Sequence, residues 1–170
     1  MRKFAKVTLL STKEIHDSVH LKDLGPDPLD KKFTYAAFKS QLLKRSNGKI
    51  KTVLMDQSLI AGIGNIYSDE ILWRASVHPL SMVSKIPEKN LKEMFKAMKE
   101  VLSKGIRFGG DSMSDYRNIE GERGKFQDHH KAYKRNKKPC LKKGCKGILE
   151  RVVVGTRSAH FCPVHQELYK

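Results

Sequence analysis

Three cysteines and one histidine near the C-terminus have the residue types and the spacing of a metal site. Cys140 and Cys145 form a C-x4-C pair, and Cys162 and His165 form a C-x2-H pair after sixteen intervening residues. Thiolate sulfur and imidazole nitrogen are ligands of tetrahedral Zn²⁺, and ligand pairs at such spacing are typical of zinc fingers. We therefore expect one structural Zn²⁺ per chain, bound by these four residues.

The residues between the two ligand pairs predict a β-hairpin. Residues 147–154 read as a strand, 155–157 as a turn and 158–161 as a second strand. A hairpin of this size has almost no core, so a metal at its base would supply the folding free energy. The alternative is three unrelated free thiols and a surface histidine. Rival ligands are also present: His129, His130 and His160.

A glycine turn within residues 56–70 has the composition of an anion site. The segment reads as two helices joined by Gly62-Ile63-Gly64, with Asn65 placed to cap the second helix. The glycines would allow close approach by another backbone. Unpaired N–H groups and the positive end of the helix dipole make a phosphate the expected ligand. Apolar residues would hold the turn against a core: Leu59, Ile60, Ile63 and Ile66.

The composition independently indicates an anionic partner. Lys and Arg total 34 against 18 Asp and Glu, which gives a formal net charge of +16. This imbalance favours a nucleic acid as the partner, with an acidic membrane surface as the second choice. Eight basic residues and no acidic ones lie between Lys131 and Lys146. Arg157 falls at the expected hairpin tip, where a guanidinium could bind phosphates in a forked geometry.

Membrane-spanning and secreted classes are disfavoured. The sequence has no run of about 18 apolar residues that could span a bilayer. Residues 1–3 are followed by mixed polarity, unlike the apolar segment of a signal peptide. Three cysteines cannot pair completely, which argues against a disulfide scaffold. We expect a soluble, intracellular protein.

Caps and apolar spacing mark the helices that must position these residues. Thr34 can cap a helix that runs to about residue 45, and shorter helices are expected over residues 49–55 and 66–75. A longer helix is expected from about Pro87 to Arg107. Its apolar stripe would face the core: Leu91, Met94, Phe95, Met98, Val101, Leu102 and Ile106. Residues 111–127 read as a long loop.

Together these motifs resemble the formamidopyrimidine-DNA glycosylase and endonuclease VIII family of base-excision-repair enzymes, essentially along the whole chain. Residues 54–67 resemble the family's helix-two-turn-helix signature, and residues 75–79 its continuation. Residues 109–116 and 124–127 resemble the loop that closes over an extruded lesion in the formamidopyrimidine branch. Residues 139–166 resemble the zinc finger.

The resemblance implies double-stranded DNA, damaged or abasic, as the partner, and it assigns DNA-binding roles to particular residues. Lys51 and Asn65 would grip phosphates around the lesion, and Tyr67 would lie in the same wall. Arg157 would contact the phosphates that flank the flipped nucleotide. We expect a cytoplasmic protein without a membrane partner, associated with the nucleoid when bound to DNA.

The N-terminal residues resemble the end of the family's β-rich catalytic domain. Arg2 and Phe4 would fill the void left by the extruded base and wedge the opposite strand. The family's chemistry begins at an N-terminal proline that forms a Schiff base, followed by a glutamate, whereas this chain opens with Met1-Arg2. We therefore expect no catalytic residue here and no activity of the chain alone. A missing N-terminal catalytic domain would have to supply the chemistry, and a second copy could pair with the unpaired strand remnant to make a dimer.

The implied fold is mainly α: a helical bundle with a helix-two-turn-helix motif, a C-terminal zinc-bound β-hairpin and a short N-terminal strand remnant. The expected division is 1–24 for the remnant, 25–32 for a linker, 33–130 for the helical domain and 131–170 for the finger. His165 stands where the family usually has a fourth cysteine, and zinc tolerates this change. The implied function is the DNA-binding part of a formamidopyrimidine-type DNA glycosylase/AP lyase. The alternatives are a binding-only nucleic-acid module and a glycosylase that uses an unrecognised nucleophile.

Overall fold

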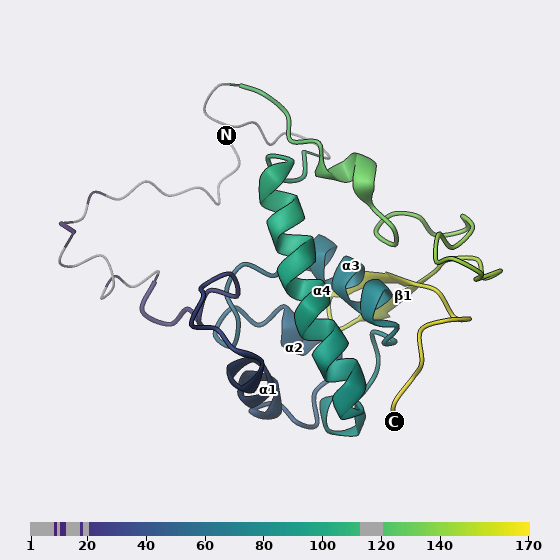
Figure 1. Ribbon diagram of the computed structural model, residues 1–170, viewed down its shortest axis with the longest axis horizontal. Helices are drawn as coiled ribbons and strands as arrows, with labels where there is room; N and C mark the ends of the chain where they lie inside the picture. The colour runs from purple at the N-terminus through teal and green to yellow at the C-terminus, as the bar shows by residue number, and fades with distance from the viewer. Residues whose placement is uncertain (1–8, 10, 13–17, 19–20, 113–120) are drawn as a thin grey trace.

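The computed structural model describes residues 9, 11–12, 18, 21–112 and 121–170. Arg2, Phe4 and most of the expected strand remnant lie outside the described residues, as does the centre of the expected lesion loop. Helices and one small antiparallel hairpin make up the regular structure of the described part, in line with the expected mainly α fold (Figure 1). No helix in this part is long and apolar enough to cross a membrane.

The helices of the described part lie close to their expected positions. They are α1 (Tyr35–Leu43), α2 (Ile50–Leu54), α3 (Asn65–Ala75) and α4 (Glu88–Arg107), with short 3₁₀ helices η2 (Val83–Lys85) and η3 (Phe126–His129). Thr34 caps α1 as predicted, because its Oγ1 accepts a hydrogen bond from the Ala37 N–H at 3.3 Å. The long helix α4 crosses the molecule and packs on α3 (Figure 1).

The apolar stripe of α4 forms much of the core, with one exception. Met94 and Met98 are fully buried, and Leu91, Val101 and Leu102 are nearly so. Ile106 was expected in the same stripe, but it is 70% exposed. The prediction was wrong for Ile106 because the last turn of α4 borders an open groove instead of the core. Helical spacing identifies a face of a helix but not where its neighbours end.

The hairpin consists of β1 (Glu150–Val154) and β2 (Arg157–Phe161), paired antiparallel with Val154 opposite Arg157 and Glu150 opposite Phe161. Residues 155–156 make the turn. Arg157 is therefore the first residue of β2 and not a turn residue as expected. Its side chain is exposed.

The core is divided into two clusters that meet at α3. The larger cluster lies among α1, α2, α3 and α4 and includes Phe38, Leu54, Ile60, Ile63 and Ile71. The smaller cluster holds the finger: Trp73, Ala132, Cys140, Leu149 and Cys162. Since Trp73 belongs to α3, the finger shares a core residue with the helical part. The C-terminal tail strengthens this connection, because His78 donates its N–H to the Glu167 carbonyl at 2.8 Å.

Candidate nucleic-acid interface and metal centre

The structure brings the four expected metal ligands together. Their ligand atoms all lie within 4.8 Å of one another. The Cys145 and Cys162 sulfurs are 3.6 Å apart, and the Cys140 sulfur lies 3.4 Å from His165 Nδ1. Sulfurs about 2.3 Å from a tetrahedral zinc ion would be separated by roughly 3.8 Å. The cluster therefore has the donor set and the size to hold one metal ion.

Neighbouring groups orient these ligands. His165 Nε2 lies 3.0 Å from the carbonyl oxygen of Trp73. A proton on Nε2 would satisfy that carbonyl and leave the Nδ1 lone pair for a metal. Burial lowers the pKa of His165, which favours the neutral ring. The Trp73 side chain also donates from Nε1 to the Cys140 sulfur at 3.4 Å. The end of α3 thus supports the metal site from two directions.

The thiols have contrasting surroundings. Burial raises the pKa of Cys162 to about 11, whereas the N–H of Gly147 lowers the pKa of Cys145. The same glycine is required by space, because a Cβ at position 147 would lie 2.5 Å from the Cys162 sulfur. The three rival histidines are engaged elsewhere: His160 contacts Asp69, His130 contacts Asp111, and the His129 ring packs on the Phe108 ring with the centroids 3.9 Å apart.

The glycine turn faces open space. Gly62 has φ +82°, and a Cβ built at Gly62 or Gly64 would meet no atom of the described residues within 4 Å. Gln57, an exposed residue, bridges the turn: its Oε1 accepts from the Gly62 N–H, and its Nε2 donates to the Ile63 carbonyl, both at 2.8 Å. Sequence reasoning gave Gln57 no role. The only signal was an amide side chain, able to donate and accept, five residues before a glycine turn.

Asn65 was predicted to cap α3, but this prediction was wrong. Gly64 occupies the cap position in an extended conformation, and Asn65 is the first helical residue. The first hydrogen bond of the helix runs from the Ser68 N–H to the Gly64 carbonyl at 3.0 Å. The side-chain Oδ1 of Asn65 is buried without a hydrogen-bond partner among the described residues. The Asn65 amide is therefore not used as a helix cap.

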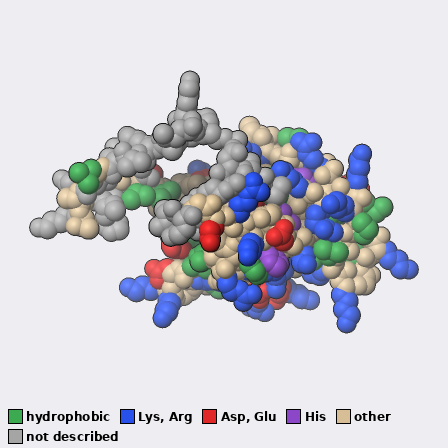
Figure 2. Space-filling view, turned by 90° about the horizontal axis from the view of Figure 1, so that it is seen from above, with side chains coloured by type: hydrophobic (Ala, Val, Ile, Leu, Met, Phe, Trp, Pro, Cys, Tyr) green, Lys and Arg blue, Asp and Glu red, His purple; other side chains and the backbone are tan. Residues whose placement is uncertain are grey.

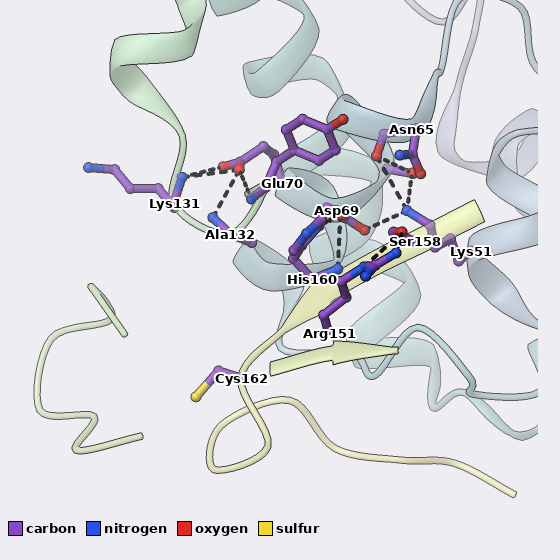
Figure 3. Close-up of polar contacts among 12 residues, drawn as sticks. Lys51, Asn65, Asp69, Glu70, Lys131, Ala132, Arg151, Ser158, His160 and Cys162 are labelled. Atoms are coloured by element: carbon purple, nitrogen blue, oxygen red, sulfur yellow. Dashed lines mark hydrogen bonds and ion pairs between the residues drawn. The ribbon is translucent and has the colours of Figure 1, made fainter. Parts of the chain in front are cut away.

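Lys51 was expected to bind a phosphate, but its ammonium contacts groups inside the protein. The residue is fully buried, and Nζ donates to Asp69 Oδ1, to Ser68 Oγ at 3.1 Å and to the Asn65 carbonyl at 3.3 Å (Figure 3). An ammonium has three N–H donors, so none remains for a phosphate. Burial lowers the pKa of Lys51, and the Asp69 carboxylate opposes that shift. Lys51 supports the backbone of the turn from inside the protein.

Two adjacent acids on α3 hold the finger in place. Asp69 Oδ2 accepts from the backbone N–H of His160 and lies 3.0 Å from its ring Nδ1. Glu70 accepts backbone N–H bonds from Lys131, Ala132 and Tyr133 at 2.9–3.0 Å (Figure 3). Sequence reasoning missed both acids. The available signal was two adjacent acidic residues within the helix that follows the glycine turn, in a strongly basic chain.

The remaining expected residues lie around this framework. Tyr67 is half-buried, with its ring centroid 5.1 Å from that of Phe126. Arg157 is exposed beside the hairpin turn, and that turn lies against α2, because a Cβ at Gly155 would be 3.8 Å from Thr52 Oγ1. Figure 2 shows Lys and Arg side chains spread over the visible face, with few acidic groups among them.

The family model described as "Formamidopyrimidine-DNA glycosylase H2TH domain" matches residues 24–117 of this chain. The formamidopyrimidine-DNA glycosylase of Solibacter usitatus is 44% identical over 140 residues, which cover 82% of this chain and 51% of the relative. That of Bacillus subtilis is 38% identical over 162 residues, which cover 95% of this chain and 58% of the relative. The chain thus spans little more than half the length of these curated relatives.

Solved structures give the same result. The Thermus thermophilus MutM (Fpg) protein superposes with a TM-score of 0.77 at 40% identity, over 84% of this chain and 53% of that chain. Lactococcus lactis Fpg, in complex with DNA that contains an abasic site, superposes with a TM-score of 0.82 at 34% identity. The match covers 93% of this chain and 57% of that chain. Since the family match covers more than half of the sequence, this chain belongs to the formamidopyrimidine-DNA glycosylase H2TH domain family.

Proposed function

We propose that this chain is the DNA-binding region of a base-excision-repair DNA glycosylase/AP lyase of formamidopyrimidine type, with damaged or abasic double-stranded DNA as its partner. One observation carries the proposal: the open glycine turn and the exposed Arg157 are held together by a buried network centred on α3. The L. lactis relative, whose structure contains abasic-site DNA, supports it. A cytoplasmic, nucleoid-associated location would follow from such a partner.

The start of α3 supplies the first phosphate contact in this proposal. The first-turn N–H groups and the helix dipole attract an anion. Gly62 and Gly64 leave room for a backbone to approach. The Asn65 amide, which does not cap its own helix, would donate to the phosphate, with Tyr67 beside it.

Arg157 supplies the second contact. A guanidinium can bind a phosphate through two parallel N–H bonds, and the exposed position at the start of β2 allows this. The surplus of basic residues, among them those between Lys131 and Lys146, would add attraction that is independent of DNA sequence. Lys51 acts indirectly, by supporting the Asn65 backbone.

We infer that the metal is one Zn²⁺, bound by Cys140, Cys145, Cys162 and His165. The three thiols, the imidazole and the Trp73 carbonyl that fixes its tautomer support this inference. Bound zinc would stabilise the base of the hairpin. We further propose residues 25–32 as the linker, 33–130 as the helical domain and 131–170 as the finger, with Trp73 as the residue that joins the last two.

Fluorescence anisotropy with a labelled duplex that contains a tetrahydrofuran abasic analogue tests the function. We expect binding by the unaltered chain, weakened about 10- to 100-fold by Arg157→Ala, the range for charge-assisted hydrogen bonds. Lys96→Ala is the matched control, because it removes one exposed cation from α4 that pairs with Glu93. An equal loss for both variants, or no binding by the unaltered chain, would contradict the proposal.

A further inference from the structure

Asp69 connects the two proposed phosphate-binding elements. Its side chain is fully buried, and each carboxylate oxygen serves a different segment. Oδ1 accepts from Lys51, whose ammonium also holds the Asn65 carbonyl at 3.3 Å. Oδ2 accepts from the His160 backbone N–H at 3.0 Å. One side chain on α3 thereby contacts both the support of the glycine turn and strand β2 (Figure 3).

The position of His160 within the hairpin gives this contact a consequence for Arg157. His160 lies three residues after Arg157 in β2, opposite Arg151 in β1. Successive residues of a strand point to opposite faces, so a shift of β2 by one residue would turn Arg157 to the other face. The bond from His160 to Asp69 opposes such a shift. The hairpin turn beside Thr52 is then fixed relative to α2, the helix that carries Lys51.

We propose that Asp69 is a positioning residue: it sets the distance and orientation of Arg157 relative to the glycine turn, so that both contact phosphates of one DNA backbone at a fixed spacing. The inference rests on the proposed function for what Arg157 binds. The placement of the hairpin by Asp69 is a separate property of the free protein. A buried ion pair is weak evidence for stability, and its best-supported use is to fix one arrangement among several.

Two double variants isolate the bond between Asp69 and His160. Lys51→Met with Asp69→Leu, called the leucine variant, removes both charges, leaves the net charge unchanged and leaves the His160 N–H without an acceptor. Lys51→Met with Asp69→Asn, called the asparagine variant, also removes both charges, but the asparagine oxygen can still accept from His160. Replacing both members of the pair avoids an uncompensated buried charge, which protects folding. Arg74→Met with Glu100→Leu is the control, since it removes a surface ion pair from α3 and α4.

The measured quantity is the effect of Arg157→Ala on duplex affinity within each background, at one salt concentration. We expect a loss of about 10- to 100-fold in the unaltered chain, in the control and in the asparagine variant. In the leucine variant the loss should fall below about 3-fold, because Arg157 no longer reaches its phosphate in the right orientation. A full Arg157 effect in the leucine variant, with its helical circular dichroism intact, would overturn the proposal.

NMR of the free protein separates this proposal from the proposed function. Contacts between Gly155 and Thr52 protons, and slow exchange of the His160 amide, should persist in the asparagine variant and be lost in the leucine variant. If these NMR results are obtained but the protein does not bind DNA, Asp69 still positions the hairpin, and the proposed DNA-binding function is rejected. Unchanged contacts in the leucine variant would reject the positioning role. If the leucine variant does not fold, the same measurements on Lys51→Met with Asp69→Val decide, because the smaller valine also cannot accept from the His160 N–H, and an unshifted hairpin in that variant overturns the proposal.

Discussion

Lys51 shows how one buried acid changes the role of a basic residue. In a chain with 34 Lys and Arg residues, no local pattern separates an ammonium that binds DNA from one that is enclosed. Its partner Asp69 is eighteen residues away, and the two meet only because α2 packs on α3. The expected metal ligands were different, because residue type and spacing were sufficient to select four residues whose ligand atoms lie within 4.8 Å of one another.

Replacing Lys51 alone should destabilise the protein strongly. Lys51→Met leaves the Asp69 carboxylate buried without its cation, a change that costs about 3–5 kcal/mol. Urea unfolding followed by circular dichroism measures this. The double variant with Asp69→Leu should recover most of the loss, whereas Lys96→Met, at a surface pair, should change stability by less than about 1 kcal/mol. A Lys51→Met protein as stable as Lys96→Met would show that the pair is unimportant.

At the scale of elements, local signals located the helices and the hairpin, but they did not show how these pack. Thr34 caps α1 as expected, because a cap depends only on its next three residues. The join between finger and helical part depends on Trp73, Asp69 and Glu70, whose partners lie more than sixty residues away. Such long-range contacts produce no periodic pattern in the sequence. The core of the finger is therefore not separate from the helical part, since Trp73 of α3 lies in the finger's cluster.

Metal removal should consequently affect α3 as well as the hairpin. Trp73 is the only tryptophan and is 8% exposed, with Nε1 donating to the Cys140 sulfur at 3.4 Å. Chelation should unfold the hairpin and shift the tryptophan emission to longer wavelength, while most of the helical circular dichroism remains. Elemental analysis should find one zinc per chain, and Cys162→Ser should lose it. Full metal content in that variant, or an unchanged emission spectrum after chelation, would contradict the assignment.

The contact between α1 and α4 should weaken at alkaline pH. Burial and a hydrogen bond to Glu88 raise the pKa of Tyr35 from 10.0 to about 12. Because the folded-state pKa is the higher one, the contribution of the neutral phenol is complete below pH 10 and is lost as the pH rises towards 12. Absorbance at the phenolate wavelength should show a late titration step that Tyr35→Phe reduces. Tyr169, whose pKa is also raised to about 12, should account for the rest. A single step near pH 10 for all phenols would contradict this.

For the whole molecule, net charge and fold give different information about the proposed DNA partner. The net charge of +16 is a property of composition and could be obtained without any structure. It predicts attraction to polyanions but not which face binds. The proposed binding face follows from the fold, since α3 presents the open glycine turn at its start and Asp69 of the same helix accepts a hydrogen bond from β2, the strand that begins at Arg157. Composition therefore indicates the class of partner, and long-range packing determines the geometry of contact.

DNA binding should accordingly be mainly electrostatic and mainly independent of sequence. If the surface neutralises about five phosphates, a plot of log affinity against log salt concentration should have a slope of roughly −4 to −5. Anisotropy titrations on an undamaged duplex, from about 50 to 200 mM salt, measure that slope. Arg157→Ala should make it shallower by about 1, because one phosphate contact is lost, whereas Lys96→Ala should leave it unchanged. A nearly flat salt dependence would show that the excess of basic residues does not contact the DNA backbone, and an equal effect of both variants would show attraction by net charge alone, without a fixed contact at Arg157.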